Sequence, residues 1–388
     1  MSKPLVLTCD IGTQSARALL VDPDGRIVDV VQSKYAEPYF SKEPGWAEQK
    51  PNFYFDRLCE CCRELCARSN ALLPDVIAMT ITVIRDTVVC LDANNEPLRD
   101  IILWLDKRTV DPNGAMPAKN MMLFKVAGME PTAKVVYAAS VGNWIMRHEP
   151  EIWARTAKYV MLPTYLNYKL TGNLIDSASN QIGHIPFDYK NRRWMKPGSL
   201  TRCFCDVPNE KLCDLVPSGT VIGTVTDEVC ALTGIPAGLP LISTGSDKGC
   251  ETLGLAVVDS DKASISLGTT ATIQFSTTEY VEPQQFLPAY PGVLNDHYNP
   301  EIEIYRGLWL LSWFVKEFGT ADAIDAKEKG MAPEALLDER IRDLPAGSDG
   351  LLLQPYWTAG ILHPDSLGAV IGFSDYHTRY HFYRAIIE

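Results

Sequence analysis

The chain has 388 residues, of which 36 are Lys or Arg and 48 are Asp or Glu, giving a net charge of −12 near pH 7. With 46% hydrophobic and 22% charged residues, its composition is that of an ordinary globular protein, and its length allows about two or three domains. The negative balance argues against a nucleic-acid partner, because binding to a phosphate backbone needs clustered Lys and Arg. Any anionic ligand must therefore be held by local groups.

Apolar and cysteine residues bear on the cellular setting. The apolar stretch at 76–84 is far shorter than the roughly 20 residues that span a bilayer. No export signal is visible, so we expect no membrane partner. Eleven cysteines in such a chain predict reduced thiols and a cytoplasmic protein. Cys59, Cys62 and Cys66 share one face of a predicted helix, which favours packing over a metal site because no second ligand pair is apparent.

The first elements form a β-meander, a helix and two more strands. Alternation of apolar and polar residues predicts the strands at 5–9, 18–22, 27–32, 76–82 and 87–91, and the helix at about 52–67. Residues 115–215 are predicted to be mainly helical, with Trp144 and Trp153 as core anchors.

The second half of the chain repeats the pattern of the first. We place the boundary so that an N-terminal domain covers residues 1–243 and a C-terminal domain covers 244–388. Two predicted strands flank Gly268, as two flank Gly12. One strand–Gly–Thr–strand hairpin in each half indicates a duplicated α/β unit.

Each Gly-Thr turn can bind an anion, because main-chain N–H groups between two strands lack a partner in the sheet. Gly12 and Gly268 would let phosphate oxygens approach the main chain. The hydroxyl donors would be Thr13, Ser15, Thr269 and Thr270. Either turn alone is more simply interpreted as a tight hairpin. Two in equivalent places favour a clamp around the phosphates of a nucleotide, which differs from a Walker loop because a strand follows each Gly.

Asp10, Arg17 and Asp247 are the charged candidates near these hairpins. Asp10 can hold Mg²⁺ through water and so neutralise triphosphate charge, or it can cap the turn. Arg17 can contact a phosphate, or it can pair with a surface carboxylate. Asp247 lies between a predicted strand and a predicted helix, where an Asp is most often an N-cap. Its place between the hairpins also suits a general base that accepts the proton of an attacking hydroxyl.

Arg85 and Asp86 interrupt an otherwise apolar β segment. They form either a surface ion pair or a polyol-binding pair, since a guanidinium that donates beside a carboxylate that accepts suits a vicinal diol. Trp104 and Asp106, in the run Trp-Leu-Asp-Lys-Arg, either wall the same pocket or anchor a core or loop.

Six motifs in this order make the chain resemble the FGGY carbohydrate kinase family, which includes xylulokinases, ribulokinases and glycerol kinases. The resemblance covers nearly the whole chain. Its motifs are Asp-x-Gly-Thr-x-Ser-x-Arg at 10–17, Pro-Gly-Trp-Ala-Glu-Gln at 44–49, Trp-x-Asp-x-Arg at 104–108, Leu-Thr-Gly at 170–172, Gly-Ser-Asp at 245–247 and Ser-Leu-Gly-Thr at 266–269. A further stretch, 368–388, is similar to the family's C-terminal signature.

This resemblance implies two actin-like, ribonuclease-H-like domains with a cleft between them. It also implies ATP and Mg²⁺ as cosubstrates, and phosphorylation of a hydroxyl of a small sugar or polyol such as a pentulose or glycerol. By the same resemblance, Asp247 is the catalytic base, Asp10 the metal-associated carboxylate, and Gly307 a residue near the nucleotide. Arg85 and Asp86 match the Arg-Glu pair that holds the polyol in glycerol kinases.

Departures from the family pattern qualify these expectations. Val83 and Ile84 replace polar or Gly residues before the substrate pair, which leaves the sugar unassigned. Family members continue beyond the position of Glu388 into an adenine-binding segment, so the second domain is expected to be incomplete and adenine binding weak. The alternative function is a non-catalytic sugar-binding or regulatory protein with a defective nucleotide site. A homodimer remains open.

Overall fold

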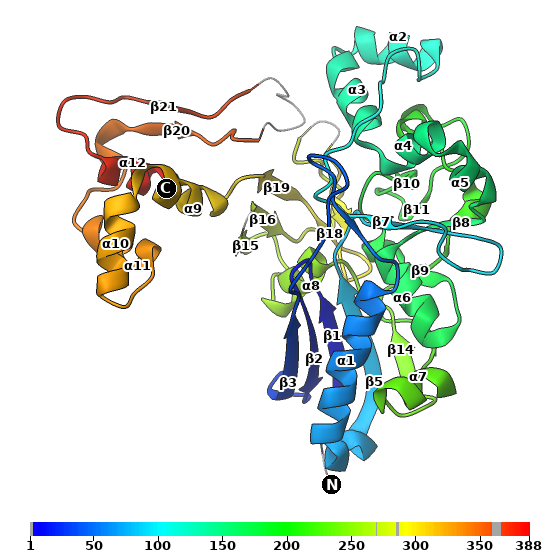
Figure 1. Ribbon diagram of the computed structural model, residues 1–388. Coiled ribbons are helices and arrows are strands. Elements are labelled where there is room, and N and C mark those ends of the chain that lie inside the picture. Colours follow the sequence, from blue (N-terminus) through cyan, green and yellow to red (C-terminus); the bar gives the residue numbers. More distant parts are fainter. Residues whose placement is uncertain (1–2, 269, 285–286, 359–365) are drawn as a thin grey trace. The chain divides into compact units, whose positions relative to one another are not determined.

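The computed structural model describes residues 3–268, 270–284, 287–358 and 366–388 (Figure 1). The chain divides into two compact units. Unit 1 comprises Met1–Lys262 and Ser276–Pro300, and unit 2 comprises Ala263–Phe275 and Glu301–Glu388. Unit 1 extends past residue 243, where we expect the N-terminal domain to end, because the helix after that point and the segment 276–300 pack within it. The domain boundary itself stays a prediction.

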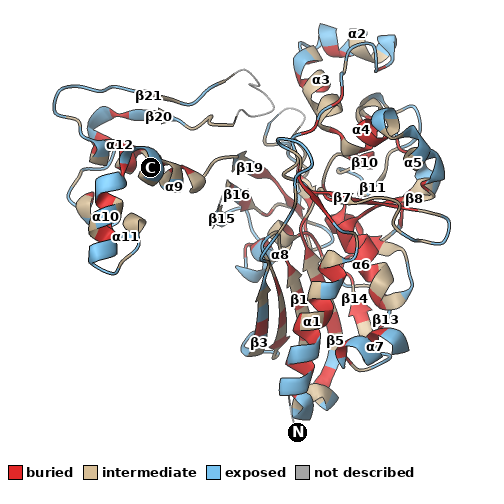
Figure 2. Cartoon of the chain, in the orientation of Figure 1, coloured by how far each residue is buried: buried red, intermediate tan, exposed pale blue. Residues whose placement is uncertain are grey.

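The core of unit 1 is a six-stranded sheet in the order β13-β14-β5-β1-β2-β3. Its strands are β1 (Leu5–Ile11), β2 (Ser15–Val21), β3 (Ile27–Lys34), β5 (Val76–Val83), β13 (Val221–Thr224) and β14 (Pro240–Ile242). Strand β1 is antiparallel to β2 and parallel to β5, and every second residue of β1 is buried. The predicted meander at the start of the chain is therefore confirmed. Figure 2 shows buried residues along β1 and β5.

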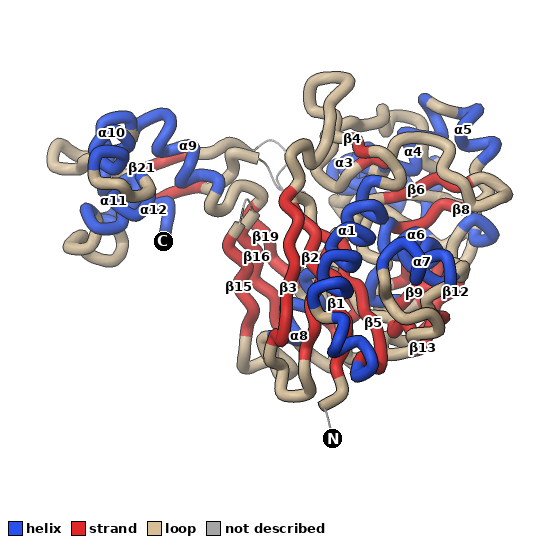
Figure 3. Tube along the Cα trace, turned by 60° about the horizontal axis from the view of Figure 1, so that its bottom comes forward, coloured by secondary structure: helices blue, strands red, loops and turns tan. Residues whose placement is uncertain are grey.

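Helix α1 (Phe53–Arg68) packs against β2 and β3 of this sheet and against α7 (Asp227–Thr233) (Figure 3). Its cysteines lie on the buried face, and the Sγ atoms of Cys9 and Cys62 are 3.5 Å apart. Burial raises the pKa of the Cys59 and Cys66 thiols to about 12. They are therefore neutral and pack as small apolar groups, as the helical pattern predicts.

A second, four-stranded sheet in unit 1 has the order β4-β7-β6-β8. Its strands are β4 (Glu48–Gln49), β6 (Val88–Leu91), β7 (Ile101–Ile102) and β8 (Lys158–Met161). The neighbouring helices are α2 (Ala118–Val126), α3 (Glu130–Ala139), α4 (Val141–His148), α5 (Pro150–Arg155) and α6 (Leu162–Thr171). The remaining elements of unit 1 are β9 (Ile175–Ser177), β10 (Phe187–Asp188), β11 (Arg193–Trp194), β12 (Asp214–Val216), α8 (Asp247–Gly254), β17 (Tyr290–Pro291) and β18 (Tyr298–Asn299).

The prediction of mainly helical structure over 115–215 is wrong beyond Thr171. Gly172 has φ 80° and ends α6 with a left-handed cap, a conformation that Gly adopts without steric cost. Short strands, loops and 3-10 turns follow, with Gly183 and Gly198 also at positive φ. The apolar residues of this stretch pack as loop anchors, and their spacing misled the sequence interpretation.

Unit 2 contains a three-stranded antiparallel sheet and a group of helices. The sheet has the order β15 (Ala263–Leu267), β16 (Ala271–Phe275) and β19 (Glu301–Ile304). The other elements are α9 (Trp309–Phe318), α10 (Thr320–Glu328), α11 (Pro333–Arg340), β20 (Leu352–Gln354), β21 (Ala369–Ile371) and α12 (Arg379–Ile387). Phe314, Leu337, Phe382 and Tyr383 form the core between the helices. In the part of the chain that the structure describes, no helix is long and apolar enough to cross a membrane.

The sheet of unit 2 has an unusual distribution of side chains over its two faces. Ile265 pairs with Ile273, which pairs with Ile302, and these three residues are 61%, 41% and 44% exposed. The alternate positions are polar and buried: they are Ser264, Thr272, Gln274 and Glu301. One face is therefore apolar and exposed, and the other is polar and covered.

Candidate functional site

The first hairpin brings Asp10 and Arg17 together. The two residues are paired across β1 and β2, and Arg17 Nη1 lies 2.6 Å from Asp10 Oδ2. Their side chains remain 43% and 31% exposed for Arg17 and Asp10, respectively, so both can still meet a ligand. The N–H of Gly12 donates to the carbonyl of Ser15 at 3.0 Å and closes the turn. Main-chain donors for an anion must therefore come from the residues beside Gly12.

Trp104 contacts this hairpin, whereas Asp106 is held elsewhere. Trp104 Nε1 donates to Thr13 Oγ1 at 3.0 Å. The carboxylate of Asp106 accepts from the N–H of Ala47 at 2.6 Å and from Arg108 Nε at 2.8 Å, and its side chain is 1% exposed. Arg108 in turn lies over the ring of Trp46 at 3.8 Å. The observed partners of Asp106 favour a structural role over the expected contact with a sugar.

Asp247 is the first residue of α8, in the turn that follows β14. The capping role suggested for it belongs to Ser246, whose Oγ accepts from the N–H of Gly249 at 3.2 Å. Asp247 Oδ1 accepts from the N–H of Lys248 at 2.8 Å. A Cβ atom on Gly245 would lie 2.7 Å from Val293 Cγ2 and 3.2 Å from Ser179 Cβ, so a larger residue at this point of the turn would require these side chains to shift. Close packing thus fixes the backbone that presents Asp247.

The electrostatics of unit 1 connect Asp247 with Arg85 and Asp10. Burial raises the pKa of the Asp247 carboxyl, and the positive charge of Arg85 partly opposes this rise. Burial also raises the pKa of the Cys250 thiol, to which the negative charges of Asp247 and Asp10 both contribute. Asp247 and Asp10 therefore both act electrostatically on one thiol of α8, and Arg85 acts on Asp247.

A magnesium ion fits the chemistry of Asp10, a partly exposed carboxylate oxygen donor beside the hairpin. Among the described residues, no three His, Cys, Asp or Glu side chains form a group that could hold a metal. An ion at Asp10 would thus keep most of its water ligands, as Mg²⁺ commonly does when it also binds phosphates.

Asp86 lies in a tight turn after β5, with φ 49°. Its two carboxylate oxygens accept from one residue, His184: Oδ1 from the main-chain N–H at 2.9 Å, and Oδ2 contacts Nδ1 at 2.8 Å. Arg85 lies beside it, with its guanidinium carbon 5.4 Å from the ring centre of Tyr290. Asp86 of the expected polyol pair therefore has an additional partner, His184, which the sequence analysis did not single out.

The second hairpin lies in unit 2. The N–H of Gly268 donates to the carbonyl of Thr270 at 2.8 Å, and the N–H of Leu308 donates to the carbonyl of Gly268 at 2.9 Å. A Cβ atom on Gly307 would lie 2.4 Å from the N atom of Ala271. Gly307 thus packs directly against the hairpin, whereas Thr269 falls outside the described residues.

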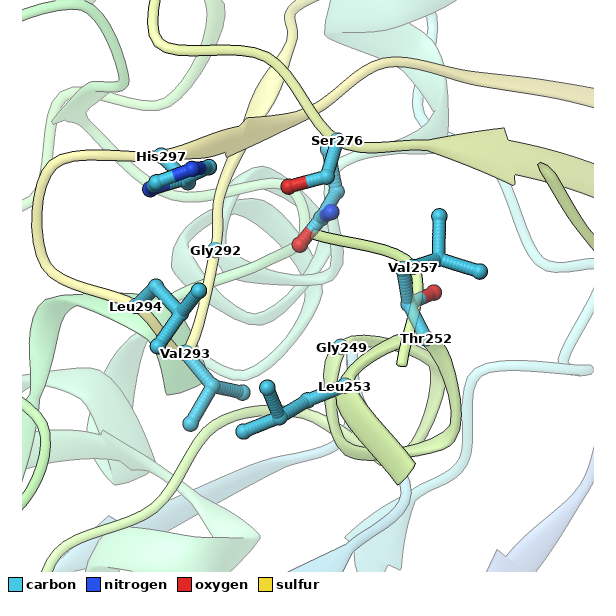
Figure 4. A pocket seen from close by; sticks show the side chains of 10 residues that line it. Gly249, Thr252, Leu253, Val257, Ser276, Gly292, Val293, Leu294 and His297 are labelled. Carbon is cyan, nitrogen blue, oxygen red and sulfur yellow. The ribbon is translucent and has the colours of Figure 1, made fainter. Parts of the chain in front are cut away.

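A recess beside α8 has a cavity volume of about 10 Å³ (Figure 4). Its lining includes Gly249, Thr252 and Leu253 from α8, with Val293 and His297 from the segment that follows β17. Ordinary ligand pockets have roughly 300–1,000 Å³. This recess is therefore too small for a typical substrate.

His184 and Gly183 are the site residues that sequence reasoning missed. His184 is 98 positions from Asp86 along the chain, in a region that we expected to be helical. No local motif marks it. The available signal is the Gly-His pair at 183–184, because Gly favours a turn.

Comparisons with known proteins agree with this architecture. The N-terminal domain of the FGGY family of carbohydrate kinases matches residues 5–254. The uncharacterized sugar kinase YgcE of Escherichia coli K12 is 26% identical over 389 residues, covering 100% of this chain and 71% of that protein. The xylulose kinase of Bacillus subtilis 168 is 25% identical over 399 residues, covering 99% and 74%.

Solved structures give the same result. The xylulose kinase from Rhodospirillum rubrum has a TM-score of 0.80 at 25% identity, covering 98% of this chain and 75% of that one. The glycerol kinase from Plasmodium falciparum, solved with ADP, has a TM-score of 0.73 at 18% identity and shares the fold. The actin-like α/β fold expected from the sequence is thereby confirmed. The chain belongs to the FGGY family of carbohydrate kinases.

Proposed function

We propose that this protein transfers the terminal phosphoryl group of ATP to a hydroxyl of a small sugar or polyol, with Asp247 as the general base. The observation that supports this most strongly is the grouping around Arg85. Arg85 precedes Asp86 in the chain, and its positive charge lowers the pKa of Asp86 and opposes the rise that burial causes in the pKa of Asp247. A pair that can hold a diol therefore interacts electrostatically with a carboxylate that can accept a proton.

In this reaction, Asp247 accepts the proton of the sugar hydroxyl. The hydroxyl oxygen then forms a bond to the terminal phosphorus, and the bond from that phosphorus to the ADP oxygen breaks. Burial raises the pKa of Asp247, which makes it a stronger base than an exposed Asp once it is ionised. Most of the rate in phosphoryl transfer comes from positioning and from neutralisation of charge.

The sugar is held by Arg85 and Asp86. The guanidinium donates to one hydroxyl of a vicinal diol, and the carboxylate accepts from the other. Trp104, which is 40% exposed and fixed by its bond to Thr13, would provide an apolar wall. Asp106 would hold the segment that carries Trp104 in place through its bonds to Ala47 and Arg108.

The phosphates of ATP are bound at the first hairpin by Thr13, Ser15 and Arg17 beside Gly12, and by the Gly268 and Thr269 motif of unit 2. Gly307 packs against the hairpin that contains Gly268. Asp10 would hold Mg²⁺, which would neutralise phosphate charge. Arg17 pairs with Asp10 in the structure, so it can turn to a phosphate when a cation takes over Asp10.

A substrate panel tests the proposal. Relatives of this chain include proteins named xylulose kinase, gluconokinase and autoinducer-2 kinase, so the panel should contain pentuloses, polyols, glycerol and gluconate. ADP release is measured with Mg²⁺ and ATP, with Asp247→Ala as the control. We expect turnover of at least one compound that the control lacks. Equal rates for both proteins, or sugar binding in calorimetry with no ATP binding, would instead support a non-catalytic sugar-binding protein.

A further inference from the structure

The loop that precedes β10, at residues 182–184, is seated on Asp86. The N–H of Asp86 donates to the carbonyl of Ile182 at 3.0 Å. A Cβ atom on Gly183 would lie 2.3 Å from Asp86 Oδ1 and 2.9 Å from its Cα atom. His184 then engages both carboxylate oxygens, one through its main chain and one through its ring. The carboxylate is therefore fixed in one orientation by a single three-residue loop.

The two contacts with His184 leave Asp86 able to bind a ligand. A carboxylate has about four acceptor positions, and His184 occupies one on each oxygen. The side chains of Asp86 and His184 are 26% and 29% exposed, so the pair is partly open to solvent. The remaining acceptor positions can receive hydrogen bonds from a substrate hydroxyl.

The charges of the pair support each other. Burial disfavours both charged forms, but the interaction between the two residues lowers the pKa of Asp86 and raises that of His184. The other titratable or charged groups that face the pair are Arg85, Tyr159, Tyr189, Cys205 and, through Arg85, Asp247. Burial raises the pKa of both tyrosines and raises that of the Cys205 thiol to about 12, so they stay neutral near pH 7.

We propose that His184 is a positioning residue that sets the sugar affinity of this protein by holding Asp86 in the orientation that a substrate diol needs. The inference rests on the proposed function, in which Asp86 accepts from the substrate. It adds a residue from a distant loop whose own charge changes near neutral pH. An ionised Asp86 held by a protonated His184 binds a hydroxyl better than one whose partner has lost its charge, because the charged pair fixes the carboxylate more strongly.

The protonation of His184 determines how sugar binding depends on pH. His184 is protonated below its raised pKa, and the ion pair with Asp86 is then complete. As the pH rises through that pKa, the histidine becomes neutral and its hold on Asp86 weakens. We therefore expect the sugar KM to increase on the alkaline side, with the KM for ATP unchanged. A bridge that only supported the fold would not separate the two constants in this way.

The central experiment compares His184→Ala and His184→Gln with wild type. We expect His184→Ala to raise the dissociation constant and the KM of the sugar at least tenfold, with kcat and the KM for ATP within about threefold. Glutamine can still donate one hydrogen bond to Asp86, so His184→Gln should retain sugar affinity at neutral pH but lose the alkaline change. His148→Gln is the matched control, because His148 is exposed and stacks on Trp144, 5.0 Å between ring centres.

Sugar binding is also measured by calorimetry without ATP, in wild type and in Asp247→Asn. The alkaline loss of affinity should persist in Asp247→Asn, because it belongs to His184. Imidazole NMR should show the pKa of one histidine above 6.5 in wild type and a return toward the ordinary value in Asp86→Asn. If His184→Ala fails to fold, His184→Gln and the NMR titration still decide.

The experiments distinguish a failure of the His184 inference from a failure of the proposed function. Turnover with sugar affinity unaffected by both His184 substitutions overturns this inference alone. So does an equal loss of sugar and ATP affinity, or a titration without a shifted histidine. A wild-type protein that neither binds nor phosphorylates any member of the panel overturns the proposed function, and the inference with it.

Discussion

The two Gly-Thr hairpins share a local design but differ in what surrounds them. In unit 1, β1 and β2 lie inside a six-stranded sheet, with Leu7 and Ile11 each 1% exposed and α1 packed against β2. In unit 2, Ile265 and Leu267 of β15 are each 61% exposed. The glycine amide closes the turn in both hairpins. The sequence pattern thus determines the turn, whereas the flanking elements determine burial.

The difference extends to the chemistry that each unit carries. Asp10, Asp247, Arg85, Asp86 and His184 all belong to unit 1. Unit 2 contributes Gly268 and Gly307, neither of which has an ionisable side chain. This division predicts that changes in unit 1 will affect catalysis and sugar binding, and that changes in the hairpin of unit 2 will affect folding or nucleotide binding.

The largest effect is expected from Asp247→Asn. Asparagine cannot accept the proton, so kcat should fall by roughly 10²–10⁴-fold, while the sugar still binds. Because burial raises the pKa of Asp247, wild-type activity should fall as the pH decreases through a value above the roughly 3.9 of an ordinary Asp. Steady-state kinetics between pH 5 and 9 measure both effects.

Glu251→Gln is the matched control for that experiment, since Glu251 lies one turn later on α8 and pairs with Lys248. It should retain most of the activity. A kcat for Asp247→Asn above one tenth of the wild-type value would contradict the role of Asp247 and, with it, the functional contrast between the units.

Gly307→Ala should destabilise unit 2. The new methyl group would lie 2.4 Å from the N atom of Ala271, so the hairpin backbone must move. Overpacking of this kind costs about 1–3 kcal/mol. Gly268→Ala is the comparison, because its Cβ atom would come no closer than 3.7 Å to Thr270 O. Hydrogen exchange of the β16 amides should accelerate in the first variant and stay nearly unchanged in the second; equal exchange would disprove the predicted clash.

Gly12→Ala and Gly268→Ala sharpen the comparison of the hairpins themselves. A Cβ atom on Gly12 would lie 3.4 Å from Ser15 O, so the methyl group should be tolerated in both variants. If phosphates approach both turns, each variant should raise the KM for ATP roughly tenfold, or ~1.4 kcal/mol. An effect in only one variant would show that the two hairpins, though alike in local structure, do not have equivalent roles.

The smallest effect concerns the exposed apolar face of the β15–β16–β19 sheet. Large apolar patches promote association, so the protein should self-associate in a concentration-dependent way. Ile273→Lys should reduce the mean mass measured by light scattering at high concentration. Ile77→Lys is the control, because Ile77 is 58% exposed on β5 of unit 1. A wild-type protein that stays monomeric at every concentration would rule out this consequence.

Much of the fold could be predicted from sequence, because strands with strict alternation and a helix with one buried face carry their own signal. The meander at the N-terminus, α1 and the paired hairpins belong to this class. The helical prediction is wrong over residues 172–215, because the buried apolar residues there anchor loops, and loop anchors have no fixed spacing.

The candidate site shows the same limit. Asp10 and Arg17 lie in the strands that flank the first turn, and Asp247 begins the helix that follows β14, so their positions followed from the neighbouring elements. His184 reaches Asp86 through tertiary contact alone, and the crowding at Gly183 appears only when the two loops are brought together. Asp106 carries a plausible motif, but its hydrogen bonds to Ala47 and Arg108 become visible only in three dimensions.

The hydrogen bond from Trp104 to Thr13 gives the molecule a natural optical reporter. An indole whose N–H is bound to a loop changes its emission when that loop rearranges or gains a charged ligand. Because Trp104 is partly exposed and the chain has 8 tryptophans, replacing Trp104 by Phe would isolate its contribution by difference. If a nucleotide binds at the first hairpin, as proposed, its arrival would be followed in real time without attaching a dye.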